Sequence, residues 1–174
     1  MPPQPRTAVC AGGLDFRLDA ELLAAVAEAL PAWRFLLAGR VHPTLDRRLE
    51  RPANVQLAGS LPAEAIPRFL AAASVCLLPY RADSYGDALF PIKLVEYLAA
   101  GRPVVGTPIQ AMKAFSDVVD VAGDADGFAA AIERTAAEDD VAKRRRRRER
   151  VGEYSWDARM DQMQHAIEMA LGDG

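Results

Sequence analysis

Short apolar runs alternate with helix-like patterns along most of the chain. Each run is four to six residues long, and together they occupy residues 7–11, 33–38, 54–58, 74–79, 103–106 and 117–121. Short apolar runs separated by helical segments are typical of the buried strands of a parallel sheet. The pattern therefore predicts an α/β fold, a Rossmann-like doubly wound parallel sheet of about six strands with helices on both faces.

Four helical segments lie between or after these runs, at residues 18–31, 62–73, 91–101 and 124–138. Asp19 is placed to cap the first of them. Pro91 stands at the first helical position of the third, and Gly101 follows its last turn. These local signals predict where the helices begin and end.

The C-terminal region, residues 138–174, has a helical pattern only, with Ser155 as a candidate N-cap. Its last segment carries an apolar stripe formed by Trp156, Met160, Met163, Ile167 and Leu171. A stripe of this length requires a covering surface. Either it packs on the sheet of its own domain or it docks on something else, and the sequence leaves both open.

An arginine-rich run, residues 143–150, follows three acidic residues at 138–140. Acidic residues at the start of a helix are favoured by the helix dipole. The sequence also places acids four residues before bases, at Asp139–Lys143 and Asp140–Arg144. We therefore predict an exposed polar helix that joins the sheet to the last helix. The alternative is a peripheral contact with an acidic phospholipid surface.

Length and composition indicate one globular domain of ordinary size. The chain has 174 residues, of which 51% are hydrophobic. We expect a Pro-rich lead-in at residues 1–6 and a single domain at 7–174. The net charge of −3 argues against a nucleic-acid partner.

Cysteine and histidine usage indicates no metal site. The two cysteines, Cys10 and Cys76, lie in apolar runs and are predicted to be buried free thiols, and the two histidines are scattered. No segment resembles a secretion signal or is apolar for the ~18 residues that a membrane span requires. A cytoplasmic protein is expected.

The segment 91–101 carries the most specific candidate chemistry. On a helical wheel drawn at 100° per residue, Lys93 and Glu96 lie on one side of the helix. The opposite, apolar side contains Ile92, Leu94, Val95, Leu98 and Ala99. The start of this helix is expected at the carboxyl edge of the sheet, where free amide groups and the helix dipole favour a phosphate. Lys93 adds a positive charge, and Glu96 can accept hydrogen bonds from ribose hydroxyls. The pattern predicts a nucleoside-diphosphate site.

Three loops are expected to converge on the same edge. Gly12 and Gly13 follow the first strand and allow a ligand to approach the backbone, and Arg17 adds a charge. Gly39 and Arg40 follow the second strand, and Ser60 and Leu61 follow the third. The first loop lacks the third glycine of a dinucleotide-binding motif, so a dinucleotide is not predicted.

Several segments closely resemble one family of glycosyltransferases, namely "FLLAGRV", "NVQLAGSLPAEAIPRFLAAASVCLLPYRAD", "FPIKLVEYLAAGRPVVGTP" and "YSWDARMDQM". The chain is similar to the C-terminal, donor-binding half of GT-B enzymes of the retaining glycosyltransferase family four. The resemblance implies a nucleoside-diphosphate sugar as donor, UDP being favoured over GDP, and no metal or other cofactor.

The resemblance also implies roles for individual residues. Glu96 matches the second glutamate of the family's paired motif and would hold the ribose. The backbone of Phe90, Pro91, Ile92 and Lys93 would bind the diphosphate, with Lys93 and Glu96 as the residues that support catalysis. The loops at Gly12–Gly13, at Gly39–Arg40 and at Ser60–Leu61 would contact phosphate and base.

The chain departs from the family pattern at the donor-sugar position. The first glutamate of the paired motif falls on Ala88, with Asp87 beside it, and the usual cations of the first loop are replaced by Gly13 and Leu18. Arg17 and Lys93 remain as cations. Asp87 and Ala88 are therefore the candidate donor-sugar residues.

The N-terminal acceptor-binding domain of a GT-B enzyme has no counterpart in these 174 residues. We therefore expect that the isolated chain binds nucleotide but transfers no sugar, and that its last helix packs on the missing domain. The main alternative is a degenerate, non-catalytic domain that acts as a scaffold. A receiver domain fits less well, because its acidic cluster is missing. A GT-B-fold sugar-nucleotide epimerase would also need both halves, and the region of the paired glutamates fits transferases better.

Overall fold

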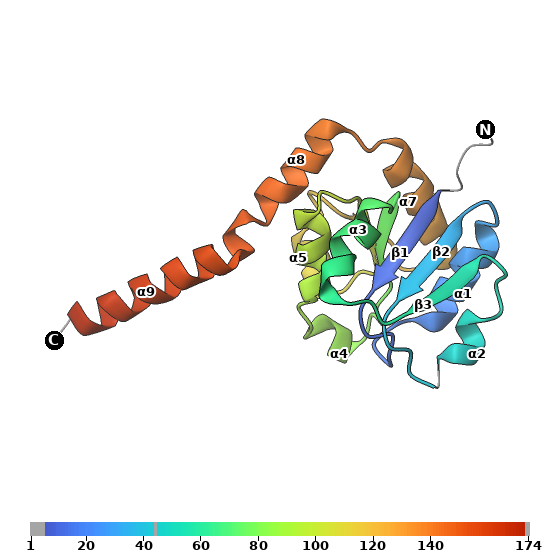
Figure 1. Cartoon of the computed structure of the whole chain (residues 1–174), viewed down its shortest axis with the longest axis horizontal. Coiled ribbons are helices and arrows are strands. Elements are labelled where there is room, and N and C mark those ends of the chain that lie inside the picture. Colours follow the sequence, from blue (N-terminus) through green and yellow to red (C-terminus); the bar gives the residue numbers. More distant parts are fainter. Residues whose placement is uncertain (1–5, 44, 173–174) are drawn as a thin grey trace.

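The computed structural model describes residues 6–43 and 45–172. Six parallel strands form one sheet in the order β3-β2-β1-β4-β5-β6 (Figure 1). The strands are β1 (Thr7–Ala11), β2 (Arg34–Ala38), β3 (Val55–Gly59), β4 (Val75–Leu78), β5 (Val104–Gly106) and β6 (Asp120–Val121). This is the strand order of doubly wound dinucleotide-binding sheets, and it confirms the predicted fold class. Of the predicted lead-in, only Arg6 lies within the described residues.

The last strand is shorter than predicted. The expected run was 117–121, but only Asp120 and Val121 pair with β5. The amides of Val118 and Val119 instead donate to the carbonyl of Phe115, so these residues form a turn. The apolar character of Val119 reflects its burial in the core, not a place in the sheet.

The helices cover both faces of the sheet. They are α1 (Ala20–Ala29), α2 (Asp46–Leu49), η1 (Ala63–Ala65), α3 (Ile66–Ala71), α4 (Ser84–Asp87), α5 (Ile92–Ala99), α6 (Gln110–Ala114), α7 (Ala125–Ala137), α8 (Val141–Arg150), η2 (Gly152–Tyr154) and α9 (Trp156–Gly172). Asp19 caps α1 as predicted, accepting from the amide of Leu22 at 3.0 Å.

Two apolar cores lie on opposite faces of the sheet. One contains residues of α1 and α7, and the other contains residues of α3, α5 and α6. Successive residues of β1 contribute to different cores, as the alternation of side chains along a strand requires. Cys10 belongs to the first core and Cys76 to the second, and both are buried free thiols, as predicted.

The arginine-rich run forms α8 as predicted, but its contacts differ from the expected ones. Arg147 is only 5% exposed, pairs with Asp139 at 2.5 Å and donates to the carbonyl of Gly101 at 3.2 Å. The predicted Asp139–Lys143 and Asp140–Arg144 pairs are wrong. Lys143 pairs with Glu138, Arg144 pairs with Asp139, and Asp140 caps the helix. The helix is therefore docked on the domain, with one arginine inside.

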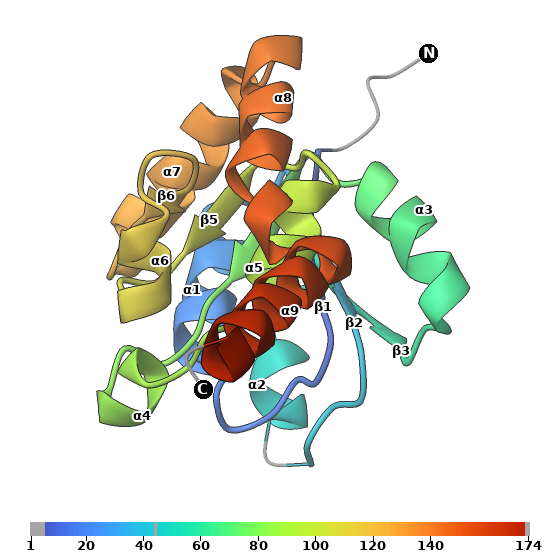
Figure 2. The same cartoon turned by 90° about the vertical axis from the view of Figure 1, so that its left-hand side faces the viewer.

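The last helix, α9, leaves the body of the molecule (Figure 1; end-on in Figure 2). Ser155 begins it as predicted, its Oγ accepting from the amide of Ala158 at 3.1 Å. The apolar stripe is exposed along its length, with exposed fractions between 53% at Ile167 and 83% at Trp156. The stripe therefore does not cover the sheet of this domain. Within the described residues, no helix has the combination of length and apolar character that crossing a membrane demands.

Candidate functional site

Glycines bring three segments into close contact at the carboxyl edge of the sheet. Gly12 and Gly39 have positive φ angles of 117° and 143°. A Cβ atom at Gly39 would lie 1.8 Å from the carbonyl oxygen of Gly12, and one at Gly12 would lie 1.9 Å from Cε of Lys93. At Gly39 a side chain is excluded by both space and backbone conformation. At Gly12 the positive φ angle disfavours a side chain, and Lys93 would have to move to make room for one.

Two adjoining hollows open at this edge. The larger, of about 620 Å³, is lined by Gly12, Lys93 and Glu96 and by apolar residues of η1, α3 and α5. The smaller, of about 320 Å³, is lined by the predicted loop residues Gly12, Gly13, Gly39, Arg40, Ser60 and Leu61. Gly12 and Ile66 line both. The structure thus brings most of the predicted nucleotide-binding residues to one continuous depression.

Helix α5 supplies the charged wall of the larger hollow. Pro91 is its N-cap and not its first helical residue, and no side chain caps the first amides. The predicted apolar side is wrong in part. Leu94 and Leu98 are buried, but Ile92 is 66% exposed and lines the hollow. Lys93, Glu96 and the apolar side chain of Ile92 therefore line the same hollow.

Tyr97, which no sequence motif singled out, is fully buried on α5. Its hydroxyl accepts a hydrogen bond from the amide of Ala11 at 2.7 Å and donates one to the carbonyl of Ala11 at 3.2 Å. Burial raises the pKa of Tyr97 well above its usual value, so the hydroxyl stays protonated. A hydroxyl-bearing ring one residue after Glu96 was the available signal, but helical periodicity placed Tyr97 outside the predicted apolar side.

Arg17 lies at the same edge but outside the two hollows. Its Nε donates to Asp15 Oδ1 at 2.8 Å and its Nη2 to Asp15 Oδ2 at 2.6 Å. This paired guanidinium holds the pKa of Asp15 below its usual value. Arg17 lines a smaller hollow of about 60 Å³ beside Phe16 and Tyr85. Lys93 and Arg40 are the cations that line the main depression.

The candidate donor-sugar residues lie on the short helix α4 and just after it. Asp87 accepts from the amide of Gln110 at 3.0 Å and so caps α6, and Ala88 is exposed. The ring of Phe90 stacks on Tyr154, with centroids 5.5 Å apart and planes 8° apart. The side chain of Phe90 therefore faces the C-terminal segment, and its backbone is the part that leads into the start of α5.

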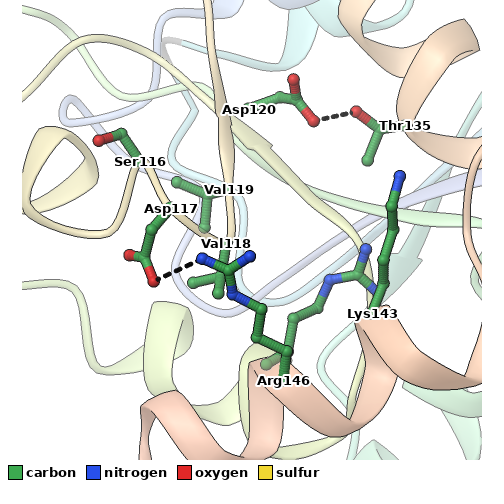
Figure 3. A pocket seen from close by; sticks show the side chains of 9 residues that line it. Ser116, Asp117, Val118, Val119, Asp120, Thr135, Lys143 and Arg146 are labelled. Atoms are coloured by element: carbon green, nitrogen blue, oxygen red, sulfur yellow. Dashed lines mark hydrogen bonds and ion pairs between the residues drawn. The ribbon is translucent and has the colours of Figure 1, made fainter.

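A further hollow, of about 200 Å³, lies away from this edge, between the turn before β6 and helices α7 and α8 (Figure 3). It is lined by Lys143, Arg146 and Arg147, but these cations have partners. Arg146 pairs with Asp117 at 3.7 Å, Lys143 pairs with Glu138, and Arg147 pairs with Asp139. Thr135 donates to Asp120 on the opposite wall (Figure 3). The three cations that line this hollow are therefore all paired with acidic residues of the protein.

The sequence of residues 6–138 matches the family described as glycosyl transferases group 1. The chain belongs to this family. The matched region ends just before α8, so the carboxyl-edge site lies wholly within the family domain, and α8 and α9 lie beyond it.

Individual relatives agree with this assignment. Over 99 residues the chain is 35% identical to TuaH of Bacillus subtilis (strain 168), a protein named for a role as a glycosyltransferase in teichuronic acid biosynthesis. That match covers 55% of this chain and 25% of TuaH. The chain thus spans only part of the length of this curated relative.

Solved structures share the fold at low sequence identity. A sucrose-phosphate synthase from Thermosynechococcus elongatus superposes over 100% of this chain and 47% of its own, with a TM-score of 0.82 and 23% identity. An α,α-trehalose-phosphate synthase (UDP-forming) from Burkholderia xenovorans superposes over 94% of this chain and 44% of its own, with a TM-score of 0.69 and 17% identity. This group 1 domain corresponds to slightly less than half of either chain.

Proposed function

We propose that this group 1 domain is the donor-nucleotide-binding half of a retaining glycosyltransferase that uses a nucleoside-diphosphate sugar. The observation that carries the proposal is the placement of Lys93 and Glu96 in one hollow at the carboxyl edge. Lys93 lies against Gly12, and Glu96 follows it on α5. A positive charge followed by a carboxylate on one helix suits a diphosphate followed by a ribose.

In this proposal the first amides of α5 and the ammonium of Lys93 bind the diphosphate, and Glu96 accepts hydrogen bonds from the ribose hydroxyls. When the sugar leaves, negative charge grows on the diphosphate. Amides and a cation fixed near that charge stabilise the transition state without a metal ion. Arg40, Ser60 and Leu61 in the adjoining hollow would contact the base.

UDP is the proposed nucleotide. A structural relative is named as UDP-forming, and the resemblance of the sequence favours UDP over GDP. We propose that a second domain binds the acceptor of the sugar. The chain spans less than half of each of these two structures, which supports a second domain. The exposed stripe of α9 is available to pack on that domain. The chain alone would then bind donor without transferring sugar.

The second candidate is a scaffold that has lost catalysis. The feature that favours it is the donor-sugar position, where Ala88 offers no polar group and Asp87 is engaged in capping α6. A scaffold would retain the fold without a working nucleotide site. Nucleotide binding that depends on Glu96 separates the two candidates.

The test is calorimetric titration of the chain with UDP and with GDP, comparing wild type, Glu96→Gln and Glu28→Gln. Glu28 is exposed on α1, away from both hollows, and serves as the matched control. We expect UDP to bind at one site and Glu96→Gln to weaken binding by about 1–3 kcal/mol. Glu28→Gln should leave the affinity unchanged. No binding of either nucleotide at millimolar concentration would favour the scaffold.

A further inference from the structure

Strand β1 loses its partner on one side just where the candidate site begins. On the β2 side, pairing extends from Thr7 to Ala11, but on the β4 side only Ala8 and Val9 are paired. The divergence of β1 and β4 is the switch point of the sheet, where doubly wound folds open a crevice for ligands. The amide of Gly12 returns to β2, donating to Ala38 at 2.7 Å.

The hydroxyl of Tyr97 provides the hydrogen bonds that β4 does not make to Ala11. It bonds both the amide and the carbonyl of Ala11, at 2.7 Å and 3.2 Å. A hydroxyl can do this because it both accepts and donates. Tyr97 is 0% exposed and Ala11 is 5% exposed, so without this hydroxyl two buried backbone groups would lose their partner. One side chain therefore substitutes for the missing strand pairing.

These two hydrogen bonds connect the two walls of the larger hollow. Tyr97 directly follows Glu96 on α5, and Ala11 directly precedes Gly12, against which Lys93 lies. The apolar contacts of Leu94 and Leu98 hold α5 on the sheet, but apolar packing is non-directional. The bonds to Ala11 are directional and define how far α5 stands from the first loop.

We propose that Tyr97 is a positioning residue of the nucleotide site, whose hydroxyl fixes Lys93 and Glu96 relative to the Gly12 loop. The proposal rests on the proposed function, because it assumes that a nucleotide bridges these two walls. Tyr97 itself touches no ligand. It acts through the spacing between the groups that do.

The test uses Tyr97→Phe in the full 174-residue chain, because this change removes the hydroxyl and keeps the ring. We expect UDP to bind about tenfold more weakly, which corresponds to the loss of one or two buried hydrogen bonds. The amide of Ala11 should exchange its hydrogen faster in the variant, as measured by NMR without ligand. In a Glu96→Gln background the same change should weaken UDP binding less, because part of its effect passes through Glu96.

Trp33→Phe is the matched control for lost stability. Trp33 directly precedes β2 and therefore lies at the amino edge of the sheet. It is 3% exposed, and its indole nitrogen donates a hydrogen bond to Glu133 at 2.7 Å. Trp33→Phe removes this part-buried hydrogen bond and part of the ring without touching the site. We expect Trp33→Phe to leave both UDP affinity and Ala11 exchange unchanged at a temperature where every variant is folded.

The outcomes distinguish the two proposals. If wild type binds UDP and Tyr97→Phe binds it within twofold as well, the positioning role is overturned and the proposed function stands. If wild type binds no nucleotide, the proposed function fails, and the exchange of Ala11 alone decides whether Tyr97 holds the loop. Unchanged exchange in the variant overturns that role in either case.

Discussion

The two C-terminal helices behave in the opposite way to what their composition suggests. Seven of the ten residues of α8 are basic, yet this helix is docked on the domain and buries Arg147. Helix α9 carries a long apolar stripe, yet it projects from the body with that stripe exposed (Figure 1). The difference teaches that composition indicates which surfaces need a partner but not where that partner lies.

Specific contacts explain why α8 is docked. Arg147 reaches the carbonyl of Gly101, just past the C-terminal end of α5, and Tyr154 stacks on Phe90, just before its N-terminal end. The segment from α8 to η2 therefore contacts both ends of the helix that carries Lys93 and Glu96. Helix α9 begins immediately after this anchor. Its stripe is the surface that we expect a second domain to cover.

Among changes in the C-terminal segment from α8 to α9, we expect Arg147→Met to cause the largest loss of stability. The change leaves Asp139 buried with Arg144 as its remaining partner and removes the donor to Gly101. We expect a loss of about 2–4 kcal/mol in the free energy of unfolding, measured by urea denaturation. Arg145→Met is the control, since Arg145 is exposed and pairs with the exposed Glu149, and should cost less than about 0.5 kcal/mol. Equal losses in both variants would contradict a docked α8.

A smaller effect is expected at the junction of the two helices. Tyr154→Ala removes the stack on Phe90 and the contact with Phe115, at 5.6 Å between centroids. We expect a loss of about 1–2 kcal/mol in the free energy of unfolding. Tyr154→Phe keeps both ring contacts and should restore nearly all of that stability. If Phe fails to restore it, the hydroxyl and not the ring anchors the segment.

The smallest effect on stability is expected on α9. Ile167→Ala removes the same atoms as Ile132→Ala, but Ile167 is 53% exposed and Ile132 on α7 is 0% exposed. Thermal denaturation should show a change within about 0.5 kcal/mol for Ile167→Ala and a loss of about 2–5 kcal/mol for Ile132→Ala. A large loss from Ile167→Ala would mean that α9 packs on its own domain in solution.

Local signals predicted much of the fold and part of the site. The apolar runs marked the strands, and Asp19 and Ser155 cap α1 and α9 as their sequence positions indicated. Glycines after the first two strands marked the place where loops and α5 meet. These features depend on neighbours a few residues away, so the sequence displays them directly.

Long-range contacts decided the remainder. Helical periodicity placed Ile92 on the apolar side of α5, but Ile92 is 66% exposed. Tyr97 is buried on this helix instead, and its hydroxyl finds partners at Ala11, 86 residues earlier. In the same way, the buried Arg147 has one partner nearby, Asp139, and a second in the carbonyl of Gly101, 46 residues earlier.

The sequence by itself determined most of the sheet, its helices and the edge of the sheet at which α5 begins, because backbone propensities and hydrophobic periodicity act locally. Only the tertiary structure decided which polar side chains are inside and which apolar stripe stays uncovered. The reason is physical: burial of a polar group depends on a partner being in place, and that partner comes from a distant part of the chain.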